Sequence, residues 1–198
     1  MSAKVTDQDT EKLIKDTALR VFFAEGRFNA TTQEIADAAG VNRTLINYYF
    51  RSRDKLFEQV FEEAHKQEHE LMEQIFYSGI PFKEKIERHL DVAFEQSQKY
   101  PYLEIYMVTQ VNQGCNIKNH DNMEGLLKDF YREIEEEMEK GTIHKMRPQQ
   151  FALNFISLMS FPAAMRPLLQ ETMSFTPEEF DIILEERKEV IMKTLFIK

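Results

Sequence analysis

Apolar residues recur at helical spacing along nearly all of this 198-residue chain, and little interrupts them. Only six glycines and six prolines punctuate the sequence, and no alternating β pattern persists beyond a few residues. No apolar run reaches the roughly 18 residues of a membrane span. The sequence therefore predicts an all-α fold of about nine helices, with no membrane partner.

Composition narrows the class of protein further. Hydrophobic residues make up 42% of the chain, enough for a substantial core. The single cysteine, Cys115, excludes an intrachain disulfide and a cysteine-based zinc site. The first twelve residues lack the apolar stretch of a secretory signal. We expect an intracellular protein, cytoplasmic if it is bacterial.

The charge is unevenly distributed along the chain. The net charge is −9, but residues 1–56 carry +1 and the remainder carries −10. Residues 42–56 alone carry +3. Affinity for nucleic acid depends on the local patch that meets phosphates, so the acidic total does not exclude such a partner. By charge alone, an ordinary solvated surface explains these residues as well as a nucleic-acid-binding patch does.

The segment from Thr32 to Tyr49 fits two short helices joined by a tight turn. Ala36 lies where the helices cross most closely and a small side chain is required, and Gly40 lies in the turn, where a positive φ favours glycine. The pair needs apolar residues where it packs on itself and on the preceding helix. Those positions hold Ile35, Ala39, Val41, Ile46 and Tyr49. A helix-turn-helix at about residues 31–50 satisfies all of these requirements together.

The second of these helices presents a polar outer face. A hairpin inside an ordinary helical bundle would be apolar there, whereas a polar face can enter a DNA major groove about 12 Å wide. Arginine can bind guanine bidentately, asparagine can bind adenine, and hydroxyls can bind bases or phosphates. The outward residues are Asn42, Arg43, Thr44, Leu45, Asn47 and Tyr48.

From about Lys12 to Phe61 the sequence resembles the TetR (tetracycline-repressor-like) family of bacterial transcriptional regulators. The resemblance rests on Ala18, Phe22, Ala24-Glu-Gly26, Thr31-Thr32, Ile35-Ala36, Ala39-Gly-Val41, Tyr48-Tyr-Phe50 and Arg51-Ser-Arg-Asp-Lys-Leu56. It implies a three-helix DNA-binding domain at residues 8–56. It also implies a larger helical ligand-binding and dimerisation domain at residues 57–198.

The resemblance assigns DNA contacts to individual residues. It implies phosphate contacts from Thr32, Tyr48 and Tyr49, and from Arg53, which stands where the family usually has a lysine at a helix N-terminus. Base contacts are implied chiefly for Arg43. The family commonly has a tyrosine where this chain has Asn47, and a small residue in place of Thr44. Asn47 can therefore contact a base instead of a phosphate. With Asn42, the predicted set is Thr32, Asn42, Arg43, Thr44, Asn47, Tyr48, Tyr49 and Arg53.

A dimer is expected, because helix-turn-helix dimers bind two half-sites about one helical turn apart. The last two long helices are the expected dimer surface. Their apolar residues occupy more of the helical circumference than one core stripe needs. The candidates are Phe151, Phe155, Met159, Ile183, Val190 and Ile191. A helix is expected over residues 149–171, with Pro162 and Pro167 bending or ending it. The alternative is that these apolar residues are buried inside a monomer.

The middle helices supply residues that can line an apolar ligand pocket or simply fill the core. They are Phe76, Phe94, Tyr102, Tyr106, Met107, Phe130 and Met159. His65 and His69 lie four apart, a metal-binding spacing, but no third ligand is evident and a solvated flank is expected. No metal, cofactor or enzyme motif is predicted. A sensing role for Cys115 or the two histidines stays open.

Together these patterns predict a dimeric repressor that binds a palindromic operator in double-stranded DNA and is released by a small-molecule effector. Two alternatives stay open. One is a helical small-molecule or lipid-binding protein without a DNA-binding role, and the other is a ligand-independent DNA-binding factor. The operator, the effector, the regulated genes and activation in place of repression are not determined by the sequence.

Overall fold

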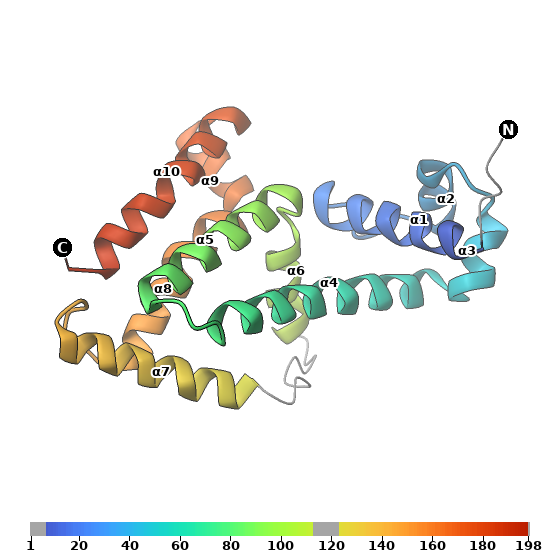
Figure 1. Ribbon diagram of the computed structural model, residues 1–198. Helices are drawn as coiled ribbons and strands as arrows, with labels where there is room; N and C mark the ends of the chain where they lie inside the picture. The colour runs from blue at the N-terminus through green and yellow to red at the C-terminus, as the bar shows by residue number, and fades with distance from the viewer. Residues whose placement is uncertain (1–6, 113–122, 198) are drawn as a thin grey trace, which may run out of the picture. The chain divides into compact units, whose positions relative to one another are not determined.

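The computed structural model describes residues 7–112 and 123–197 (Figure 1). Across these residues the secondary structure is helical without strands, which confirms the predicted all-α class. Cys115 lies outside the described residues. The helices are α1 (Asp7–Leu19), α2 (Thr32–Ala39), α3 (Arg43–Phe50), α4 (Arg53–Phe76), α5 (Phe82–Lys99), α6 (Leu103–Asn112), α7 (Met123–Lys140), α8 (Pro148–Ala164), α9 (Arg166–Met173) and α10 (Pro177–Leu195), with a π-helical segment, η1 (Arg20–Ala24), after α1.

The expected helix over residues 149–171 is two helices. Pro162 lies inside α8, which ends two residues later, and Pro167 lies in the first turn of α9. The two helices meet at an angle of 70°. Proline lacks the N–H that continues a helix, so the break follows from these two residues. The split accounts for one helix beyond the expected number.

The chain divides into two compact units, Met1–Glu70 and Leu71–Lys198, with the division inside α4. In the first unit α1 packs on α2, and α2 packs on α3. Phe22 and Phe57 close the core of this unit, with ring centroids 4.5 Å apart. The predicted functional boundary after Leu56 stays a prediction.

In the second unit α8 packs against α5, α6, α7 and α10 (Figure 1). Its buried face carries Phe151 and Phe155, which are 0% and 1% exposed. α10 begins at a reciprocal capping box formed by Thr176 and Glu179. The core continues through α5, α7 and α10 with Ile86, Leu90, Ile134, Met138, Ile191 and Leu195.

The residues predicted for the dimer surface differ in exposure. Phe151, Phe155, Met159 and Ile191 are buried within their own unit, Ile183 is half-buried and Val190 is exposed. Helical periodicity showed two apolar stripes on these helices but not which one faces the core. The exposed apolar side chains on α8 and α10 are Leu153, Ile156, Phe161, Ile182 and Val190.

The residues predicted for a pocket belong mostly to the same core. Phe76, Phe94 and Met159 are buried, with Phe130 packed against them. The α6 residues Tyr102, Tyr106 and Met107 are half-buried.

The two histidines on α4 are less exposed than expected. His69 is only 6% exposed and His65 is half-buried, so the expectation of a solvated flank is wrong for His69. Within residues 7–112 and 123–197 no three potential metal ligands cluster together. In the same residues no single helix has the length and apolarity of a membrane span, although the bent pair α8–α9 meets that test jointly.

Candidate DNA-binding surface

The turn between α2 and α3 is closed by backbone hydrogen bonds around Gly40. Its N–H donates to the carbonyl of Asp37 (3.2 Å), and the N–H of Val41 donates to that of Ala36 (3.0 Å). This pattern is a Schellman motif, which needs a left-handed residue, and Gly40 has φ +66°. A Cβ here would meet no atom within 4 Å, so backbone conformation, not space, favours glycine.

The predicted core of the helix-turn-helix packs as the pattern requires. Ile35, Ala36 and Ile46 are 0% exposed, whereas Ala39 and Val41 are half-buried at the edge of the turn. At the other end of α2, the side chain of Thr31 accepts from the backbone N–H of Glu34, and Glu34 accepts in return from the N–H of Thr31. Both ends of α2 are therefore held by local bonds.

The first residues of α3 are ordered by Asn42. Its side-chain oxygen accepts from the backbone N–H of Thr44 (2.9 Å) and from the Thr44 hydroxyl (2.8 Å). Asn42 is thus the N-cap of the helix. In the unbound chain the side chains of Asn42 and Thr44, both predicted to contact DNA, are hydrogen-bonded to each other. Asn47 and Tyr48 are exposed, Tyr48 to 71%, so their polar atoms are accessible from outside.

Two predicted contact residues from different helices are joined directly. The Nε of exposed Arg43 donates to the hydroxyl of half-buried Thr32 at the start of α2 (3.0 Å). A guanidinium carries five N–H groups, so this bond leaves donors on the two terminal nitrogens. The contact fixes the stem of the arginine side chain at the outer edge of α3.

Tyr49 is bonded within the unit. Its hydroxyl donates to the carboxylate of Asp7 at the start of α1. That hydrogen bond raises the pKa of Tyr49 to about 12, with smaller contributions from burial and from the charge of Asp7. A phosphate contact by this hydroxyl, as predicted, requires the bond to Asp7 to be exchanged for one to DNA. Sequence periodicity could not indicate this pairing, because 42 residues separate the partners.

Arg53 also has partners inside its unit. Its Nε donates to the carbonyl of Ala30 (3.2 Å), and its guanidinium lies 5.4 and 5.1 Å from the ring centres of Phe22 and Phe57. Another nitrogen pairs with Asp54 at 2.9 Å. The residue therefore ties the start of α4 to the loop before α2, in addition to its predicted place near phosphates.

Sequence reasoning missed one charged residue beside this surface. Arg27 pairs at 2.5 Å with Glu34, the same carboxylate that caps α2. Hydrogen bonds from the Thr31 backbone and side chain, and then from Arg27, lower the pKa of Glu34. Nothing in the sequence spacing indicated this pairing of Arg27.

Comparison with known proteins agrees with this arrangement. Residues 14–60 match the family described as bacterial regulatory proteins, tetR family. A curated relative, the HTH-type transcriptional regulator AcrR of Shigella flexneri, is 27% identical over 196 residues, covering 91% of this chain and 85% of the relative. Together these two matches support a TetR-type regulator.

Solved TetR-family structures share the fold along almost the whole chain. A regulator from Marinobacter aquaeolei VT8 superposes with a TM-score of 0.60 at 16% identity, covering 97% of this chain and 98% of its own. A TetR/AcrR-family regulator from Thermobifida fusca gives 0.61 at 14% identity, covering 93% and 97%. With the match over residues 14–60, this shared fold supports a transcriptional regulator with a helix-turn-helix DNA-binding motif.

Proposed function

We propose that this TetR-family regulator is a dimeric, cytoplasmic repressor whose two α3 helices occupy successive major grooves of a palindromic operator. The observation that carries the proposal is the polar outer face of α3 above an apolar core. Tyr48 is 71% exposed while Ile46, two residues earlier, is 0% exposed. A helix with this contrast is suited to insertion of its polar face into a groove.

The contacts within the surface support separate roles for its residues. Arg43, placed by Thr32, is the main base-contacting residue, with Asn47 beside it as a second. Tyr48, Thr32 and Arg53 contact phosphates. Asn42 and Thr44 act first through the cap they form. No enzymatic role is proposed.

The dimer is proposed to form through the exposed apolar residues of α8 and α10. Phe161 is 56% exposed and Ile182 is also 56% exposed, an exposure that costs free energy unless a partner covers it. Ile156→Asp together with Phe161→Asp should give a monomer in sedimentation velocity at micromolar concentration. Val108→Asp, at an equally exposed position on α6, is the matched control and should leave the dimer intact.

Release by a small molecule is the third part of the proposal. A compound bound in the second unit favours a spacing of the two α3 helices that fits the operator poorly. Such coupling is typically about 1–3 kcal/mol and requires different affinities for the two states.

Selection of bound sequences from a random DNA pool tests the function as a whole. The expected result is a palindromic site whose binding weakens steeply with salt. Arg43→Ala should lose this selectivity, whereas Arg88→Ala, an exposed arginine of α5, should keep it. Recovery of unrelated sequences by the unaltered chain would instead favour a small-molecule or lipid-binding protein without a DNA-binding role.

A further inference from the structure

Four aromatic rings from four helices form a closed circuit in the core of the second unit. Phe76 of α4 lies 5.5 Å from His89 of α5, and His89 lies 5.2 Å from Phe155 of α8. Phe130 of α7 completes the circuit, 6.5 Å from Phe155 and 5.0 Å from Phe76. We call these residues the four-ring cluster. Three members are purely apolar, so His89 is the single polar group of the circuit.

One ring nitrogen of His89 is buried without a hydrogen bond. Nδ1 of His89 is buried and has no hydrogen-bond partner among the described residues. Burial lowers the pKa of His89 to about 4, so the imidazole is neutral at physiological pH. An unpaired buried polar atom costs about 1–3 kcal/mol, and such an atom in a half-buried side chain beside three apolar rings requires an explanation.

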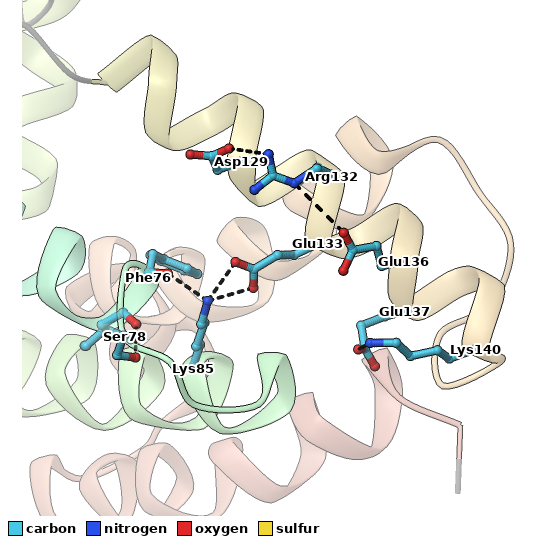
Figure 2. A network of polar contacts seen from close by, with 10 residues as sticks. Phe76, Ser78, Lys85, Asp129, Arg132, Glu133, Glu136, Glu137 and Lys140 are labelled. Atoms are coloured by element: carbon cyan, nitrogen blue, oxygen red, sulfur yellow. Dashed lines mark hydrogen bonds and ion pairs between the residues drawn. The ribbon is translucent and has the colours of Figure 1, made fainter.

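The charged groups near the cluster are already neutralised by each other. Lys85, one helical turn before His89 on α5, is 5% exposed. Figure 2 shows its ammonium group between the carbonyl of Phe76, at 2.8 Å, and the carboxylate of Glu133, at 2.7 and 2.9 Å. Three acceptor contacts use the three N–H groups of the lysine. This pair therefore offers no free charge to a ligand, and His89 is left as the polar contact.

We infer that the effector of this regulator is a neutral apolar or aromatic molecule carrying a hydroxyl group, which hydrogen-bonds to Nδ1 of His89 beside the rings of Phe76, Phe130 and Phe155. The inference rests on the proposed function, whose effector it assigns to a chemical class. A hydroxyl donates and accepts, so it satisfies Nδ1 in either tautomer of the ring. A cation and a carboxylate are both disfavoured, because each would lose its hydration beside three apolar rings and find no free counter-charge there.

A matched pair of probes tests the inference on the full-length chain. We choose 4-ethylphenol and ethylbenzene, which differ by one hydroxyl group, with binding measured by isothermal titration calorimetry. The unaltered chain should bind 4-ethylphenol about tenfold more tightly, the effect of about 1.4 kcal/mol for one hydrogen bond. In His89→Phe, which keeps a ring but removes Nδ1, this preference should disappear. His144→Phe, an exposed histidine of the same unit, should keep it.

A second measurement needs no substitution, in case His89→Phe folds poorly. Nitrogen-15 NMR of the histidine ring should show a shift of Nδ1 of His89 with 4-ethylphenol and none with ethylbenzene. A buried water molecule bonded to Nδ1 would also satisfy the atom. It predicts equal binding of both probes. Equal binding, binding of neither probe, or a preference that persists in His89→Phe overturns the inference.

The same samples separate this inference from the proposed function. Sequence-selective DNA binding is measured without any probe. Selective DNA binding without a hydroxyl preference contradicts the effector class and leaves the regulator intact. A hydroxyl preference that depends on His89, without selective DNA binding, contradicts the proposed repressor function. It still supports binding of a hydroxyl group at the four-ring cluster.

Discussion

Helices α2 and α3 of the first unit and the core of the second unit place their polar groups in opposite ways. In the first unit, polar side chains lie at the surface of α2 and α3, and the core of Ile35, Ala36 and Ile46 is apolar. In the second unit, Lys85 and the Nδ1 atom of His89 lie inside, among aromatic rings. An outward polar face suits a large charged partner such as DNA. An inward polar atom suits a small molecule that the protein encloses.

The largest expected effect concerns the buried ion pair of the second unit. Glu133→Leu leaves the ammonium of Lys85 with the carbonyl of Phe76 alone, and should lower the free energy of unfolding by about 4 kcal/mol, measured by urea denaturation. The double variant Lys85→Met with Glu133→Leu should recover most of that loss, because no unpaired charge remains.

An exposed ion pair on the same helix is the control for that experiment. Arg88 and Glu84 pair at 2.7 Å with both side chains largely in solvent. Glu84→Gln should change stability by less than about 0.5 kcal/mol. If Glu84→Gln and Glu133→Leu lower the free energy of unfolding equally, burial of the Lys85–Glu133 pair is not the cause of the loss.

The next effect is a loss of stability at acidic pH that is caused by His89. The pKa of His89 is about 4 in the folded chain, against 6.5 for an ordinary histidine. Between these values the unfolded chain binds more protons, so stability rises with pH across the window and is lost as pH falls through it. The difference corresponds to about 3 kcal/mol between pH 7 and pH 4. The urea midpoint of the wild-type chain should fall more steeply with decreasing pH than that of His89→Phe, and parallel curves would contradict this burial.

A smaller effect distinguishes two glycines. Gly40 has φ +66°, whereas Gly79 does not require a left-handed conformation, and a Cβ meets nothing within 4 Å at either. Gly40→Ala should therefore cost about 1 kcal/mol through backbone strain alone. Gly79→Ala should be neutral or slightly stabilising. Thermal unfolding of the two variants checks this, and a cost at Gly79 that matches Gly40 would remove strain as the cause.

The smallest effect concerns Asp7, the acid bonded to Tyr49. Asp7→Ala removes a negative charge from the DNA-binding unit and frees the tyrosine hydroxyl. DNA affinity should rise by about threefold, in the range of one exposed charge pair. Tyr49→Phe added to Asp7→Ala should cancel the part of this gain that comes from the hydroxyl. An unchanged affinity in fluorescence anisotropy would place Tyr49 outside the DNA contact.

What could be predicted from the sequence differs between local and long-range contacts for a physical reason. The capping box of Thr31 and Glu34, the turn at Gly40 and the apolar positions of α2 and α3 are local signals, each within a few residues. The pairs Tyr49–Asp7 and Lys85–Glu133 join residues 42 and 48 apart, and only the folded chain brings them together. Periodicity likewise identified α8 and α10 as unusually apolar but could not separate the stripe of Phe151 from that of Ile156.

The central claim is that the outer face of α3 contacts bases, and Arg43 tests it most directly. Affinities of wild type and Arg43→Ala are measured on the selected operator and on every single-base variant of one half-site, at fixed salt. Arg43→Ala is expected to cost about 1–3 kcal/mol and to remove discrimination at one position of each half-site, with the salt dependence kept. Undiminished discrimination at every position in Arg43→Ala would contradict it.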